Sequence, residues 1–190
     1  MRLILSFFII TLLSFSISLN AQEEVSPLQM KRMKLDDFID GGFASFFNTS
    51  EKSKILNEDG TTTIHYKTGG FKEYVDIFIR VNANNIIIAS KLEIDRSWIK
   101  KSRTFAFDIE KSFINEFSLD KEYTKPLVNK IWTFGKETEE DLKDEQLQGL
   151  FDVIIGKEHD HEYTHEGQQL FKFYNLKKEE GGFTLVTEIN

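Results

Sequence analysis

The sequence contains no cysteine, only two prolines and only four histidines. The absence of cysteine excludes disulfides, thiol nucleophiles, thiolate metal sites and a lipid anchor on a cysteine. Beyond residue 21, no apolar run approaches the roughly 20 residues that a membrane-spanning helix needs. Proline-rich linkers and internal repeats are also missing from the sequence. We therefore expect one domain, residues 22–190, that is stabilised by packing alone.

Residues 1–21 have the layout of a secretory signal peptide. Arg2 provides the positive start, an apolar run extends from Leu3 to Phe15, and smaller or polar residues precede Ala21. The apolar core of about 13 residues is short for a membrane anchor. We predict cleavage near Ala21 and a secreted or periplasmic mature protein without a stable membrane anchor.

The end of this segment, Asn20-Ala21-Gln22, resembles the signal peptides of secreted Bacteroidota proteins. The resemblance implies a bacterial source, and it carries no fold or activity with it.

The chain is acidic, with 31 acidic and 24 basic residues and a net charge of −7. A field of this sign repels phosphate backbones and anionic lipids, so we expect no nucleic-acid partner. The densest basic cluster contains Arg96, Lys100, Lys101 and Arg103. Four cations in this spacing are most simply explained as a solvated face.

Helices are predicted near the start of the mature chain. Ser26-Pro27 is typical of a helix N-terminus, and Gly41-Gly42 is a stop signal. Between them the apolar residues keep helical spacing, at Leu28, Leu35, Phe38 and Ile39. The pattern of the next stretch, residues 43–56, is less clear, and Phe43, Phe46 and Phe47 are compatible with a short second helix.

An antiparallel meander is predicted for the next part of the chain. Residues 61–67 are rich in β-branched side chains, and residues 74–81 alternate through Tyr74, Asp76, Phe78 and Arg80. A third strand is expected at residues 86–95, after a polar turn.

The segment 96–117 is ambiguous, because its phenylalanines alternate at first and then recur every four residues. We predict helix for its second half and leave 96–109 open between strand and helix. Pro126 interrupts the next segment, and the type of 127–134 also stays open.

A stronger helix is predicted from Thr138, which resembles a capping residue, to Gly156, with an apolar face in its second half. The chain is expected to end in a hairpin of residues 170–176 and 183–189. The resulting fold class is α+β: a single domain with an antiparallel meander sheet and helices packed on one face.

Three of the four histidines lie in the segment 158–166, which contains the pattern H-E-x-x-H at His161, Glu162 and His165. In zinc peptidases two histidines four residues apart share a helix face and bind zinc, while the glutamate activates the metal-bound water. Here charged residues surround the pattern, Gly167 would stop a helix, and no histidine follows His165 as a third ligand.

In an extended segment, His159, His161 and Tyr163 would face one side and Asp160, Glu162 and Thr164 the other. His159, His161 and His165 are therefore the candidate metal ligands, and zinc is the cofactor that we consider for them. The alternative is a polar loop or edge strand without metal. His65 stands alone in a predicted strand and is expected to be structural, although the fold could bring it to the cluster.

The sequence has no G-x-S-x-G elbow, no phosphate-cradling glycine loop and no dinucleotide fingerprint. We therefore predict an exported, non-catalytic binding or envelope-associated protein whose partner is a protein or a small-molecule ligand. The alternative function is that of a divalent-metal-binding protein or zinc hydrolase that uses the histidine cluster.

Overall fold

A seven-stranded antiparallel sheet forms the centre of the protein. The computed structural model describes residues 30–119, 121–134, 144–165, 168–179 and 182–189. The strand order is β1-β2-β3-β4-β7-β6-β5, so the C-terminal strand lies in the middle of the sheet. The strands are β1 (Ser50–Leu56), β2 (Thr62–Lys67), β3 (Val75–Val81), β4 (Ile87–Asp95), β5 (Asp160–His165), β6 (Gln168–Lys177) and β7 (Phe183–Ile189).

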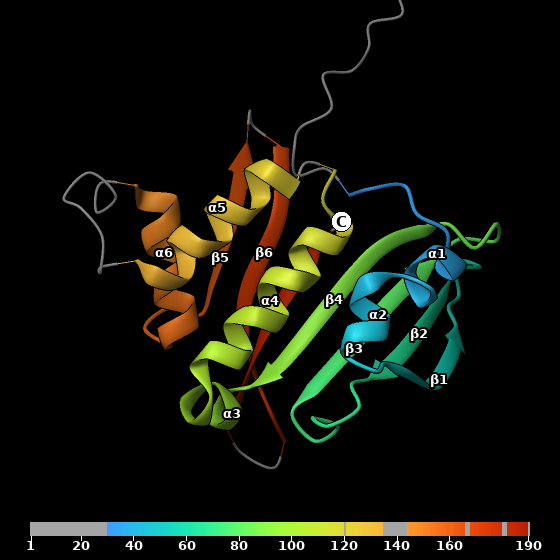
Figure 1. The fold of residues 1–190 in the computed structure, drawn as a ribbon, viewed down its shortest axis with the longest axis horizontal. Helices are drawn as coiled ribbons and strands as arrows, with labels where there is room; N and C mark the ends of the chain where they lie inside the picture. Colours follow the sequence, from blue (N-terminus) through green and yellow to red (C-terminus); the bar gives the residue numbers. More distant parts are fainter. Residues whose placement is uncertain (1–29, 120, 135–143, 166–167, 180–181, 190) are drawn as a thin grey trace, which may run out of the picture.

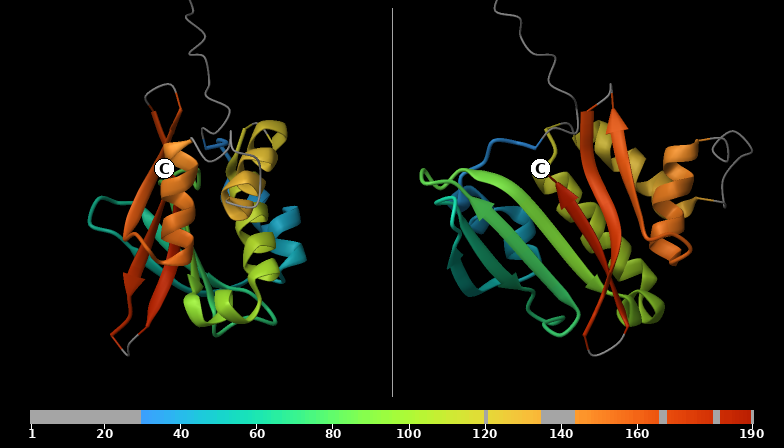
Figure 2. Two further views of the ribbon diagram at one scale, coloured as in Figure 1. Left: turned by 90° about the vertical axis from the view of Figure 1, so that its left-hand side faces the viewer. Right: turned by 180° about the vertical axis from the view of Figure 1, so that it is seen from behind.

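The helices cover one face of this sheet, as Figures 1 and 2 show. They are α1 (Leu35–Ile39), α2 (Gly42–Phe46), α3 (Arg96–Lys101), α4 (Arg103–Phe117), α5 (Lys121–Thr133) and α6 (Glu145–Ile155). In Figure 1, α1 and α2 lie in front of β2 and β3, and α4 runs alongside β4. The predicted α+β class, with helices on one face, is confirmed.

Strict alternation in β3 shows why the sheet has one covered and one open face. Val75, Ile77, Ile79 and Val81 are buried under the helices, whereas Asp76, Phe78 and Arg80 are only half-buried and point the other way. Because side chains alternate across a strand, a sheet with one apolar side needs a cover on that side only. The meander of β2, β3 and β4 was predicted from this pattern and is confirmed.

Aromatic packing joins the N-terminal helices to α4. Phe38 of α1 is fully buried, and its ring centroid lies 5.7 Å from that of Phe117 and 5.7 Å from that of Tyr66 on β2. Phe113 continues the cluster at 5.0 Å from Phe117. Rings at these separations add about 0.5–1.5 kcal/mol per pair beyond the area that they bury.

Helix α6 matches its sequence signal at the C-terminal end, whereas its N-terminal cap is a residue that the sequence pattern did not indicate. Asp144 caps α6 by accepting hydrogen bonds from the backbone N–H groups of Gln146 and Leu147, each at 3.1 Å. The helix stops at Gly156, whose φ of +81° is left-handed and favours glycine. Thr138, the predicted start, lies outside the described residues, but Asp144 is extended with φ −82° and ψ 99°, so α6 begins at Glu145, later than predicted.

The predicted helix through residues 28–40 is wrong for most of its described part. Only Leu35–Ile39 is helical, and Lys34 is extended with φ −77° and ψ 154°. Met30 and Lys34 instead form isolated bridges to Ser118 and Ile86. Docking of this segment on its neighbours, with Met33 buried, replaces the helix that its periodicity favoured.

The structure defines three other segments that the sequence pattern left undecided or did not predict. Ser50–Leu56 forms the exposed edge strand β1. The undecided residues 96–109 are helical in α3 and α4, except for Ser102, which separates the two helices. Helix α5 continues through Pro126. Proline lacks the N–H group that would bond to the carbonyl of Glu122, and here that loss falls near the start of the helix.

The C-terminal hairpin is confirmed as β6 paired with β7. No helix in the described part of the chain has the length and apolar character to cross a membrane. Residues 1–21, the predicted signal peptide, lie outside the described residues.

Candidate functional site

The open face of the sheet carries charged and aromatic side chains from neighbouring strands. Lys91 of β4 stands at its centre, because it pairs with Phe78 of β3 on one side and with Glu188 of β7 on the other. Arg80 pairs with Ala89 in the next row. Outward side chains of paired strands meet in rows across a sheet, so these five residues form one surface.

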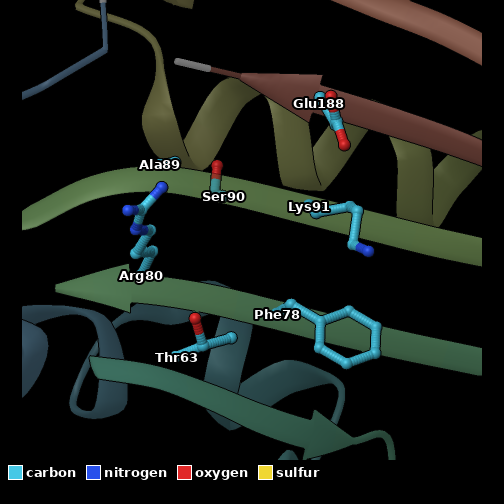
Figure 3. Close-up of a pocket in the computed structure, with 7 residues that line it drawn as sticks. All are labelled: Thr63, Phe78, Arg80, Ala89, Ser90, Lys91 and Glu188. Atoms are coloured by element: carbon cyan, nitrogen blue, oxygen red, sulfur yellow. The ribbon is translucent and has the colours of Figure 1, made fainter. Parts of the chain in front are cut away.

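A depression of about 290 Å³ lies in this surface (Figure 3). It crosses β2, β3, β4 and β7, and the small side chain of Ala89 leaves room between Arg80 and Lys91. Its volume is at the lower end of the roughly 300–1,000 Å³ typical of ligand pockets. The lining residues are Thr63, Phe78, Arg80, Ala89, Ser90, Lys91 and Glu188.

Phe78 on β3 is held in place by side chains from the two paired strands, β2 and β4. The imidazole of His65 stacks on it with ring centroids 4.6 Å apart and planes 12° apart, and Lys91 Nζ lies 4.5 Å from its centroid. His65 Nε2 is 2.5 Å from Oδ1 of Asp76, which also pairs with Lys67. These contacts fix the aromatic side chain as part of a polar network.

Arg80 is fixed at the other end of the depression. Its Nε donates to Thr61 Oγ1 at 2.8 Å, and its guanidinium pairs with Asp59. Hydrogen bonds from Thr61, first from its hydroxyl, lower the pKa of Asp59, with a smaller contribution from Arg80. The Asp59 carboxylate therefore stays ionised beside the guanidinium.

A second depression, of about 420 Å³, continues from the first because both are lined by Thr63 and Arg80. Its other lining residues belong to the turn before β2, at Asn57, Glu58 and Asp59. The two depressions therefore adjoin at Thr63 and Arg80, and their polar lining extends from this turn to Glu188. We call the two together the open-face groove.

Glu188 closes the groove on β7. The phenol of Tyr174 donates a hydrogen bond to Glu188 Oε1 at 2.6 Å. Burial, together with this bond to a carboxylate, raises the pKa of Tyr174, so the phenol keeps its proton and remains a donor. The groove thus presents the guanidinium of Arg80 and the ammonium of Lys91 between the carboxylates of Asp59 and Glu188. Fixed donors and acceptors of both signs suit binding of a polar ligand.

The histidine segment lies elsewhere, at the edge of the sheet formed by β5. Asp160 and Glu162 face the open side, where Lys172 Nζ contacts them at 3.0 and 3.4 Å. The hydrogen bond from Lys172 is the main reason that the pKa of Asp160 is lowered. A strand does not place His161 and His165 on one helix face, so the peptidase arrangement of H-E-x-x-H is not formed.

His161 points toward the helices rather than toward His159. A Cβ atom added to Gly149 of α6 would lie 2.3 Å from Nδ1 of His161, so the imidazole packs on the helix backbone. His159 is exposed, and its Nδ1 is 4.0 Å from Oδ2 of Asp160. The side chain of His165 lies outside the described part of the structure. Among the residues whose side chains are described, no three histidine, aspartate or glutamate groups converge as a metal site.

His65 does not join this segment. It lies on β2, next to one edge strand of the sheet, whereas β5 is the opposite edge. Its partners are Asp76 and Phe78, which makes it part of the open-face network.

No local sequence pattern predicts the open-face groove. The alternation of Asp76, Phe78 and Arg80 was visible, and it indicated that these side chains share one face. Their meeting with Lys91 and Glu188 depends on strand order and register, which no local pattern encodes.

The chain matches no protein-family model, no curated protein and no solved structure.

Proposed function

We propose that this protein is an exported, non-catalytic binding protein that holds a polar ligand in the open-face groove. The observation that carries the proposal is the pair of adjoining depressions between Asp59 and Glu188, on the sheet face opposite the described helices. A helix-free sheet face needs polar side chains only to meet water. Side chains in this groove are in addition held by hydrogen bonds, ion pairs or ring contacts, which contact with water alone does not require.

The chemistry of the groove favours uncharged polar or zwitterionic ligands. Arg80 and Lys91 offer donors, Glu188 offers an acceptor, and Thr63 offers both. A polyanion would meet the carboxylates of Asp59 and Glu188 and the overall net charge of −7. Because Arg80 and Glu188 already have hydrogen-bond partners, little side-chain entropy remains to be lost when a ligand binds.

Export is supported by the arrangement of Arg2, the apolar run Leu3–Phe15 and Ala21. Expression of the full chain in a bacterial host, with fractionation and N-terminal sequencing, tests it. We expect protein outside the cytoplasm that begins at Gln22. Protein that remains in the cytoplasm with residues 1–21 attached would contradict export.

The binding proposal is tested by NMR titration of the purified protein with a panel of neutral oligosaccharides, zwitterionic amino acids and short peptides. We expect at least one class to shift the backbone amides of Phe78, Arg80 and Lys91 in a saturable way, without chemical turnover of the ligand. Amides on α5, such as that of Lys130, serve as the internal control. If every compound leaves the groove amides unchanged at millimolar concentration, the proposed site is wrong. Turnover of a ligand would contradict the non-catalytic part.

A further inference from the structure

Another depression lies on the helical side of the protein, where α3 and the start of α4 meet the end of α6. Its volume is about 300 Å³, and its lining consists of Arg96, Ile99, Lys100, Arg103, Ile154 and Ile155. Figures 1 and 2 place α3 and the C-terminal end of α6 at the same end of the molecule in every view. We call it the α3–α6 cavity. It is separate from the open-face groove and shares no lining residue with it.

Arg96 is the fixed floor of this cavity. Its Nε donates to Asn175 Oδ1 at 2.7 Å, and its Nη2 donates to the carbonyl of Ile154 at 3.0 Å and to that of Val153. The last carbonyls of a helix carry partial negative charge. Arg96 therefore neutralises the end of α6, so this helix end does not repel an anion from the cavity.

Lys100 and Arg103 provide the positive charge that remains available. Arg103 Nη2 donates to the carbonyl of Trp132 at 3.1 Å, and its guanidinium carbon lies 5.7 Å from the centroid of Phe151. Lys100 is exposed. Within the described part of the chain, no carboxylate lies within 4.0 Å of Arg96, Lys100 or Arg103.

The rest of the lining is apolar. Ile99 and Ile154 are buried, and Ile155 stays 36% exposed at the mouth. A bare phosphate or sulfate would gain nothing from these three side chains, because a fully hydrated anion does not benefit from apolar contact. A carboxylate attached to a small apolar group satisfies both parts of the lining. The volume, near the lower end of the range of about 300–1,000 Å³ for ligand pockets, limits that group to a small branched or aromatic unit.

We infer that the α3–α6 cavity binds a carboxylate that is carried beside a branched or aromatic apolar group. Such a carboxylate is presented by a free organic acid and by the C-terminal residue of a peptide. In both cases the carboxylate lies between Lys100 and Arg103, and the apolar group contacts Ile99, Ile154 and Ile155.

Methyl NMR of isoleucine-labelled full-length protein tests the inference with matched pairs of probes. Phenylacetate and phenylacetamide test the free acid, and acetyl-Ala-Leu with a free or an amidated C-terminus tests the peptide. We expect saturable shifts of the methyl groups of Ile99, Ile154 and Ile155, and an affinity for each binding acid about tenfold or more above that for its amide. Binding of one acid but not the other identifies the source of the ligand.

Charge reversal at two adjacent lysines provides the matched variants. Lys100 lines the cavity, whereas Lys101 does not and lies with its Nζ 5.8 Å from the ring centroid of Tyr74. We expect Lys100→Glu to weaken acid binding about tenfold or more, and Lys101→Glu to change it less than about threefold. Equal binding of acids and amides, equal effects of the two substitutions, or unshifted isoleucine methyls with both acids at about 10 mM would each overturn the inference.

Discussion

The imidazole of His161 on β5 lies directly against the backbone of Gly149 in α6. A Cβ atom at position 149 would come within 2.3 Å of both Nδ1 and Cε1 of the ring. Glycine in a helix interior lowers stability by about 1 kcal/mol relative to alanine. Here the absence of a side chain lets the helix approach the strand. The two residues therefore form one packing unit between the edge strand and the helix layer.

Gly149→Ala is expected to lower the free energy of unfolding by about 1–3 kcal/mol, because the added methyl group overlaps the His161 ring. In a His161→Ala background the same substitution is expected to raise stability by up to about 1 kcal/mol through helix propensity. Urea unfolding of the four proteins in this double-mutant cycle measures the coupling. A loss of the same size in both backgrounds would show that the ring is not the obstacle.

Arg96→Ala is expected to destabilise the protein by about 2–3 kcal/mol. The substitution removes charge-assisted hydrogen bonds to the carbonyls at the end of α6 and to Asn175, and it leaves half-buried acceptors without partners. Arg80→Ala is the control, because the ion pair of Arg80 with Asp59 is well exposed and is expected to contribute much less to stability. Thermal or urea unfolding measures both. Similar losses for the two variants would contradict the capping role of Arg96.

Glu110 is expected to make stability depend on pH. It is fully buried, Thr187 Oγ1 donates to its Oε1 at 2.5 Å, and burial raises its pKa from 4.5 to about 8. Between these values the folded state keeps a proton that the unfolded state releases. Stability should therefore fall as pH rises from about 4.5 to 8, with a slope of at most about 1.4 kcal/mol per pH unit.

The difference between wild type and Glu110→Gln isolates this contribution. The glutamine is isosteric with the protonated acid. The stability of the variant relative to wild type should therefore increase as pH rises, and this difference should level off above about pH 8. Asp108→Asn, at an exposed position of the same helix, serves as the control. A stability difference between wild type and Glu110→Gln that stays constant from about pH 4.5 to 8 would contradict a neutral buried Glu110.

The metal hypothesis for His159, His161 and His165 has a direct measurement. His161 packs on α6, and the described side chains do not supply three converging ligands, so we expect substoichiometric metal in protein purified without chelator or histidine tag. Elemental analysis, with His161→Ala and His165→Ala as comparison proteins, measures it. One bound zinc per chain that is lost in both variants would establish the metal site instead.

Local patterns predicted the strands and helices whose apolar side chains recur with a regular period along the sequence. The alternation in 74–81 predicted β3, and the stripe ending at Gly156 predicted α6. The same reasoning failed at 30–34, where apolar spacing suggested a helix but bridges to Ser118 and Ile86 hold the chain extended. Tertiary pairing overrides propensity in a segment this short.

The candidate sites could not be predicted because they depend on long-range register. Glu188 reaches the open-face groove only because β7 lies between β4 and β6, and Ile155 reaches Lys100 only because α6 ends beside α3. The basic cluster around Lys100 was visible in the sequence, but the apolar wall that makes it a cavity comes from a distant helix.

The most direct test of ligand binding in the open-face groove is a substitution that fills the groove without removing a polar group. Ala89→Leu places a larger side chain between Arg80 and Lys91, and Ala83→Leu makes the same change in an exposed turn outside the lining. Calorimetric titration with the ligand that gives the strongest NMR response measures both affinities. We predict that Ala89→Leu weakens binding about tenfold or more while Ala83→Leu leaves it unchanged. Equal affinity of the two variants would contradict ligand binding in the open-face groove.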